Sequence, residues 1–233
     1  MKNQKGFVHL HTLFIVIFIM MIVFSIAFVG AVIQIQQEIR SECLKESVAI
    51  QKDIIHAEKI LLQMNIASTS LRVSYYAAVA VSLFPPTAAV GQAQMRAIQT
   101  LRQNLDRAQK LLIRVTETKA RIESLGLLAR LNQLSWKKRQ IWNFYLSLFS
   151  YVRLHQTPKM AVHALSSDLA PNYELDNDYK RTQRLELFWQ TFFQTKSSAQ
   201  KILDYQGSLS LTCGAIPERK GNQWSIEIIA DKF

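Results

Sequence analysis

The strongest pattern in the chain is an apolar run from Leu13 to Ile33, LFIVIFIMMIVFSIAFVGAVI, which contains no charged residue. A helix of that length extends about 31 Å, which matches the hydrocarbon core of a bilayer. A buried helix of a soluble protein normally keeps a polar stripe, and a cleaved secretory signal ends at small residues, but this run has neither. We therefore predict a single transmembrane helix at 13–33 that is retained, preceded at 1–12 by a basic leader or cytoplasmic stub.

A heptad stripe follows between Cys43 and Ser82. Its apolar members recur at steps of three and four residues, with serines in some of the gaps: Cys43, Ile50, Ile54, Ala57, Leu61, Met64, Leu71, Tyr75 and Ala78. This spacing is typical of a coiled-coil-like helix. Pro85 and Pro86 should end the helix, because neither residue offers an amide hydrogen.

A second stripe begins after the prolines and has the same helical spacing. Its members are Ile98, Leu101, Leu105, Ala108, Leu112, Val115, Ile122 and Ala129. Two long helices joined by a short connection predict an antiparallel helical hairpin over 34–133 with its turn at 84–91. The two stripes could instead pair between two chains, so self-association through the hairpin stays open as an alternative.

The return helix of such a hairpin should bring the chain back to the bilayer near Leu134, where an aromatic-basic segment begins at 134–157. Its first residues carry both rings and cations: Trp136, Lys137, Lys138, Arg139 and Trp142. Aromatic rings with cations suit the lipid headgroup region, which predicts a membrane-surface contact. The alternative is an ordinary amphipathic helix whose aromatic face packs on the hairpin.

The remaining part, 158–233, reads as a loop, one amphipathic helix from about Asn177 to Tyr205, and a C-terminal β-hairpin. The hairpin is indicated by GSLSLTCGAI and QWSIEIIADKF, which alternate apolar and polar residues on either side of PERKGN. The predicted fold class is therefore mainly α: one transmembrane helix, a long helical hairpin, further amphipathic helices and a small antiparallel β-hairpin.

The formal net charge is +11, and it is concentrated between Arg96 and Arg153, where twelve basic residues face three acidic ones. Such a surface suits acidic lipid, an acidic partner protein or the phosphates of nucleic acid. No nucleic-acid-binding motif accompanies it, so we do not expect nucleic acid as a partner.

The chain has two cysteines, Cys43 and Cys213, in no spacing that suggests a metal site. The pair suits a disulfide in an oxidising compartment, although two buried free thiols are the alternative. Basic residues on both sides of the apolar run leave its orientation open. The cysteines favour a body that lies outside the cytoplasm.

The sequence contains no motif of nucleophilic, phosphate-binding or zinc-dependent catalysis, and its histidines are scattered. The acidic group Glu174, Asp176 and Asp178 lacks the glycine and the distal glutamate of a calcium loop. We expect no catalytic residues, no cofactor and no metal.

The first residues, MKNQKG followed by Phe7 and a long apolar helix, resemble the class III signal of type IV prepilins. The resemblance implies cleavage between Gly6 and Phe7. The fifth residue of the mature chain would then be His11, where that family usually has glutamate. Its loss favours a subunit that stays in the membrane over one repeated along a filament.

The whole layout resembles TadE/TadG-like pilus-assembly proteins: an anchor, a cysteine after the membrane, a long helical hairpin, and a terminal Cys-Gly strand beside a Trp-containing strand. The resemblance implies a non-enzymatic minor pseudopilin of a bacterial inner membrane, with pilus-assembly or secretion proteins as partners and most of the chain periplasmic. The alternative is a signal-anchored coiled-coil scaffold or sensor unrelated to pili.

Overall fold

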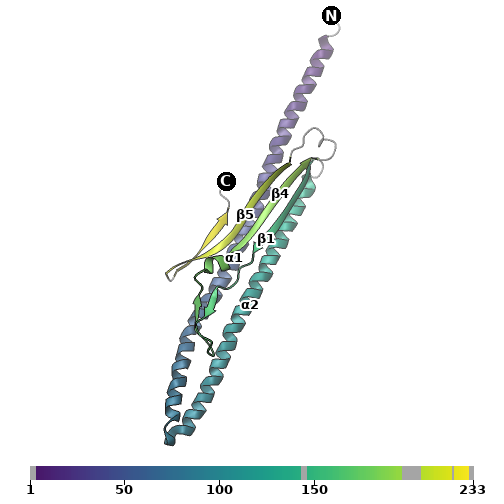
Figure 1. Ribbon diagram of the computed structural model, residues 1–233. Helices are drawn as coiled ribbons and strands as arrows, with labels where there is room; N and C mark the ends of the chain where they lie inside the picture. The colour runs from purple at the N-terminus through teal and green to yellow at the C-terminus, as the bar shows by residue number, and fades with distance from the viewer. Residues whose placement is uncertain (1–3, 143–145, 196–205, 222, 231–233) are drawn as a thin grey trace.

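The computed structural model describes the backbone of residues 4–142, 146–195, 206–221 and 223–230, and side chains within 11–136, 151–190, 210–221 and 223–229. The chain is mainly helical, with a small antiparallel sheet near the C-terminus (Figure 1). The elements in chain order are α1 (Gln4–Ser82), η1 (Pro85–Thr87), α2 (Ala88–Trp142), β1 (Leu146–Gln156), β2 (Val162–Ala164), β3 (Tyr173–Leu175), α3 (Tyr179–Thr182), β4 (Leu185–Thr195), β5 (Gln206–Lys220) and β6 (Gln223–Ala230).

Helix α1 contains 79 residues, so it extends about 118 Å and includes the apolar run and the first heptad stripe in one unbroken element. It ends where the prolines predict, because η1 begins at Pro85. The connection to α2 is tight. A Cβ atom on Gly91 would lie 2.5 Å from the backbone nitrogen of Ser82, so only glycine fits at that point.

Helix α2 runs back beside α1 (Figure 1). Two ion pairs fix their relative position. Lys119 Nζ lies 2.6 Å from Asp53 Oδ2, and the guanidinium of Arg130 donates to both carboxylate oxygens of Glu46, at 3.2 and 3.0 Å. The later residue of α2 pairs with the earlier residue of α1, so the two helices are antiparallel. Helix α2 therefore runs toward the apolar run.

The stripe predicted on α1 is the face that the structure buries: Cys43, Ile50, Ile54, Ala57, Leu61 and Ala78 are all inside. The prediction for α2 is wrong for most of its stripe, because Leu101, Ala108, Val115, Ile122 and Ala129 are exposed and only Ile98, Leu105 and Leu112 are half-buried. The face that α2 buries instead consists mainly of small and polar residues with two leucines near its end: Asp106, Gln109, Thr116, Ala120, Ser124, Leu127, Leu131 and Ser135. Small side chains allow helices to approach closely, whereas periodicity alone does not say which of two stripes on a helix is covered.

The C-terminal part contains a four-stranded antiparallel sheet in the order β1-β4-β5-β6, with β2 and β3 as a separate pair. Two predictions are corrected here. The segment 134–157 is not one amphipathic helix, because α2 ends at Trp142 and β1 follows. Within the described part of the helix predicted from Asn177 to Tyr205, only α3 is helical and β4 follows it, while 196–205 lie outside the described residues. In β4, Leu185, Leu187 and Trp189 are buried and the residues between them are not, which is the period of a strand.

The predicted C-terminal β-hairpin is present as β5 and β6, but its first strand is longer and its turn is tighter. Lys220 pairs with Gln223, and Gly221 adopts a positive φ of 63°, which the turn requires. Pro217 lies inside β5. It is tolerated because the pairing of β5 with β4 ends at Ala215, so no neighbour requires its missing amide hydrogen on that side.

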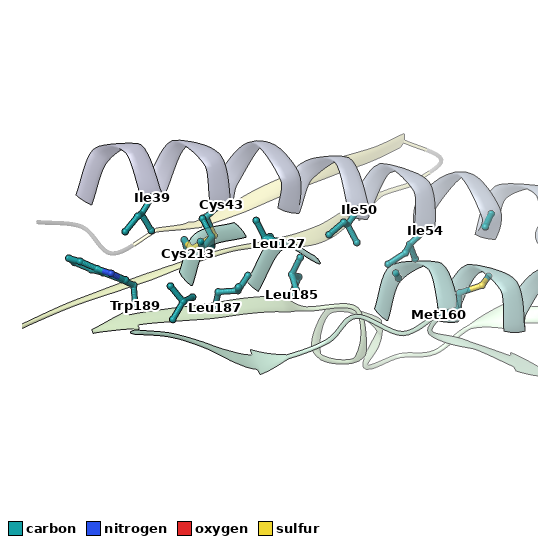
Figure 2. Close-up of a cluster of buried hydrophobic side chains, with 14 of the residues drawn as sticks. Ile39, Cys43, Ile50, Ile54, Leu127, Met160, Leu185, Leu187, Trp189 and Cys213 are labelled. Atoms are coloured by element: carbon teal, nitrogen blue, oxygen red, sulfur yellow. A yellow bond between two sulfur atoms is a disulfide. The ribbon is translucent and has the colours of Figure 1, made fainter. Parts of the chain in front are cut away.

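The main hydrophobic core lies between the sheet and the two helices, beyond the apolar run (Figure 2). Ile39, Cys43, Ile50 and Ile54 approach it from α1. Leu127 and Leu131 come from α2, and the sheet contributes its buried face: Val152, Leu185, Leu187, Trp189, Leu211 and Cys213. The chain therefore has one packed body, and the first part of α1 projects from it (Figure 1).

Two strand edges are closed by asparagine side chains from the helices. Asn132 on α2 accepts from the Val152 amide at 2.9 Å and donates to the Val152 carbonyl at 3.3 Å. Asn65 on α1 does the same for Tyr173 in β3, at 2.9 and 2.8 Å. Each amide side chain replaces the hydrogen bonds of a neighbouring strand, which protects an otherwise open edge.

Replacing Asn132 with leucine should lower the free energy of unfolding by about 1–3 kcal/mol, because it removes both partners of the partly buried Val152 backbone. Asn132→Asp keeps the acceptor but loses the donor, so we expect it to lower the free energy of unfolding as well. Gln103→Leu, at an exposed position of the same helix, is the control. Urea unfolding of the full chain measures the differences, and equal stability of all variants would contradict this function of Asn132.

Candidate functional site: a membrane anchor joined to a disulfide-linked body

The apolar run is exposed in the isolated chain. Its large hydrophobic side chains from Leu13 to Ile26 are 41–67% accessible, and α1 is the one helix among the described residues that is long and apolar enough to cross a membrane. The single hydroxyl, Ser25 Oγ, donates to the Met21 carbonyl at 2.8 Å, so it requires no water. A continuous apolar surface of this size is typical of contact with lipid or with other helices.

The boundary between the exposed run and the packed body is abrupt. Ile33 is still exposed, but Val32 and Gln36 are buried, and Ile39 lies in the core. No loop separates the two regions because α1 continues through both. A bilayer that contains residues 13–33 would therefore lie directly against the body.

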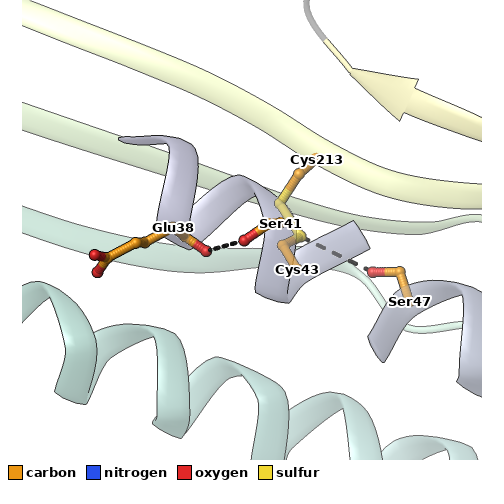
Figure 3. The surroundings of a disulfide bond; sticks show 5 residues. All are labelled: Glu38, Ser41, Cys43, Ser47 and Cys213. Atoms are coloured by element: carbon orange, nitrogen blue, oxygen red, sulfur yellow. Dashed lines mark hydrogen bonds between the residues drawn. A yellow bond between two sulfur atoms is a disulfide. The ribbon is translucent and has the colours of Figure 1, made fainter. Parts of the chain in front are cut away.

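The disulfide closes the body next to this boundary (Figure 3). Cys43 on α1 is bonded to Cys213 in β5 across 170 residues, with the two Cα atoms 6.3 Å apart. Both cysteines are fully buried, and Ser47 Oγ lies 3.9 Å from the Cys43 sulfur. The bond attaches the last hairpin of the sheet to the helix that enters the membrane region.

The other predicted site residues are only partly described. Gly6 and Phe7 lie in the first turns of α1, and their side chains are outside the described residues. Trp136 is exposed near the end of α2, as a membrane-surface contact requires. Lys137, Lys138, Arg139 and Trp142 belong to the same helix, but their side chains also lie outside the described set.

A row of polar residues on α1, which was not predicted from the sequence, holds the body against the helix. Gln51, Glu58 and Asn65 recur every seven residues, so they share one face of α1, beside the apolar stripe. Gln51 Nε2 donates to the carbonyls of Gln183 and Ala215, and Asn65 pairs with Tyr173. The heptad spacing of these three residues was the signal that could have found them.

Glu58 is the ionisable member of this row. Its Oε1 accepts from the Ala161 amide at 3.2 Å and from Gln183 Nε2, while Oε2 has no hydrogen-bond partner among the described residues. Burial, together with the nearby Asp176, raises the pKa of Glu58 to about 7 against the opposing effects of the Ala161 amide and Arg219. A proton on this carboxyl is therefore favoured in the folded chain.

None of these features forms a catalytic or metal centre within the described residues. No group of three or more histidine, cysteine or acidic side chains there could hold a metal ion. Comparison with known proteins adds no assignment, because no family model, no curated protein and no solved structure matches the chain.

Proposed function

We propose that this chain is a non-enzymatic, membrane-anchored pilus-assembly protein, similar to Tad-type minor pseudopilins, that acts by protein–protein contacts outside the cytoplasm. The observation that carries the proposal is the division of α1. Its first part exposes an apolar surface of membrane length, and the rest of the same helix is built into a disulfide-linked body. This arrangement would transmit the position of the membrane helix to the docking surface without a flexible linker.

The two long helices supply that docking surface in the proposal. Helix α2 lies beside α1 and extends the body away from the apolar run, so we propose that they act as an antiparallel, coiled-coil-like stalk. The buried disulfide supports an oxidising compartment for the body, because such bonds persist in the periplasm or outside the cell. The bacterial inner membrane then holds residues 13–33, with the leader in the cytoplasm.

The second candidate is a signal-anchored scaffold or sensor whose leader is never cut. His11 favours it, because this position carries no carboxylate to pair with the amino terminus of a neighbouring subunit. The two candidates share the anchor, the stalk and the compartment. They differ in the fate of one peptide bond, between Gly6 and Phe7.

The test is the intact mass and N-terminal residue of the protein extracted from its native membrane. The pilus proposal expects a chain that begins at Phe7, and a Gly6→Val variant that keeps its leader because the peptidase site is blocked. Lys5→Gln, which leaves Gly6 and Phe7 in place, is the matched control and should still be cut. A wild-type chain that begins at Met1 or Lys2 would overturn the pilus assignment in favour of the scaffold.

A further inference from the structure

The outer side of α2 carries a heptad stripe that the fold does not use. With Leu101 counted as position a, we call the a and d positions of the next four heptads the outer stripe. Its a positions are Leu101, Ala108, Val115, Ile122 and Ala129, and its d positions are Leu111 and Leu125 together with the polar residues Asn104 and Thr118. The structure buries the opposite face of α2, which includes Ala120 and Leu127. The outer stripe shares Leu101, Ala108, Val115, Ile122 and Ala129 with the predicted second stripe, and these residues point away from α1. The other predicted members, Ile98, Leu105 and Leu112, are half-buried.

The exposure of the outer stripe is large. Leu111, Val115 and Ile122 are 62%, 54% and 65% accessible, and a shallow groove on the same face is lined by Arg114, Val115, Thr118, Lys119, Ile122 and Glu123. The stripe covers four heptads, or about 42 Å of helix. An exposed, mainly apolar stripe of this length and period is typical of the seam of a helix pair, and a seam tolerates single polar residues such as Asn104 and Thr118.

One edge of the outer stripe is positively charged. Arg107, Arg114 and Arg121 occupy three successive g positions, are exposed, and form no ion pair with the described part of the chain. On the other edge, Lys119 is already engaged by Asp53 and Glu123. The g positions of a coiled coil choose the partner helix by charge.

From this arrangement we infer that the outer stripe binds an amphipathic helix of another protein, with apolar residues in its seam and carboxylates opposite the three arginines. A second copy of the chain does not fit the charges. In an antiparallel pair the arginines would face arginines, and in a parallel pair Arg114 would face Lys119 of the other copy. Like charges at those positions are unfavourable.

A bilayer is not the occupant either. Arg130 is level with Glu46, so the near end of the outer stripe lies about 20 Å beyond Ile33, and the stripe continues away from the apolar run along the helix axis. A membrane that contains residues 13–33 therefore meets α2 end-on and cannot lie along it. The inference depends on the proposed function in one respect, which is that the two long helices act as a docking surface for another protein.

The experiment uses the full chain, with its disulfide intact, in nanodiscs of uncharged phosphatidylcholine. The probe is a fluorescent 28-residue peptide of four heptads with Ile at a, Leu at d and Glu at every e and g position. Its own charges oppose self-pairing. Fluorescence anisotropy measures binding of this acidic peptide and of a matched peptide with Lys at e and g.

We expect the acidic peptide to bind and the basic one not to. Ile122→Asp should weaken binding at least roughly tenfold, because it places a charge in the seam. Charge reversal of Arg107, Arg114 and Arg121 to Glu should also weaken the acidic peptide roughly tenfold and should allow the basic peptide to bind. The matched control reverses Lys45, Lys52 and Lys59 to Glu, which have the same spacing on α1, and should change neither.

Three results would overturn the inference. They are no binding of the acidic peptide, equal loss with the lysine triple variant, or sedimentation showing a dimer of the wild-type chain that Ile122→Asp disperses. Circular dichroism of each variant confirms that its helices are intact. Peptide binding does not depend on the leader, so a chain that begins at Met1 would remove the pilus assignment and leave this result unchanged.

Discussion

Replacing Cys43 and Cys213 together with serine is expected to lower the free energy of unfolding by about 3–5 kcal/mol, the larger of the two main effects. The bond closes a loop across 170 residues, so its removal gives the unfolded chain much more conformational freedom. The two serine hydroxyls would also be buried in an apolar core. The body should remain folded only in the cold or in low denaturant.

Urea unfolding of the full chain, followed by tryptophan fluorescence, measures this loss. Ser41→Ala, two residues from Cys43 on an exposed position, is the control and should leave the midpoint within experimental error. Reduction of the wild-type chain should reproduce most of the effect of the double variant. If the double variant unfolded at the wild-type urea concentration, the disulfide would not be what holds β5 to α1.

The second large effect is a pH dependence that comes from Glu58. The pKa of this carboxyl is about 7 in the folded chain and 4.5 when exposed, so the folded chain holds a proton that the unfolded chain has released. The contribution of Glu58 to the free energy of unfolding should therefore be highest below pH 4.5. This contribution should fall by up to about 3 kcal/mol as the pH rises toward 7.

Glu58→Gln should remove this fall, because glutamine keeps an acceptor for the Ala161 amide and cannot ionise. At pH 8 the variant should be more stable than the wild type, and at pH 4 the difference should vanish. Glu227→Gln, on the exposed side of β6, is the control and should follow the wild-type profile. Parallel stability curves for wild type and Glu58→Gln between pH 4 and 8 would show that burial does not hold the proton there.

The elements that the sequence predicted well are those defined by local pattern. The apolar run, the end of α1 just before Pro85 and the alternation in β5 and β6 are each determined by residues close in sequence. The buried stripe of α1 was also found, because Ile50, Ile54 and Leu61 have a regular spacing and large apolar side chains.

The errors arose where a distant partner decides the structure. The segment around Leu187 and Trp189 is rich in aromatic residues and fits an amphipathic helix, but its pairing with β1 and β5 makes it a central strand. On α2, the sequence shows two possible faces, and the more hydrophobic one is exposed. Only the position of α1 and the sheet shows that the small residues Ala120 and Ser124 are the packed face.

The disulfide and the membrane helix of the candidate site could be predicted from the sequence. Its buried polar contacts were not predicted. Cys43 and Cys213 were expected as a pair because no other cysteines exist. Glu58 and Asn132 carry no motif, since their effect depends on the backbone of Ala161 and Val152, which approach from other elements. The heptad spacing of Gln51, Glu58 and Asn65 indicates a polar face on α1, but the backbone groups that these side chains contact follow only from the fold.

The measurement that tests the central claim most directly is the side of the membrane on which the body lies. A cysteine introduced at Ser167, an exposed loop position, leaves the Cys43–Cys213 bond in place and provides one free thiol. A membrane-impermeant maleimide should label Ser167→Cys in cells whose outer membrane alone is opened. It should label the double variant Asn3→Cys, Gly6→Val, which keeps its leader, only after lysis. The opposite order of labelling would place the body in the cytoplasm and contradict an extracytoplasmic docking function.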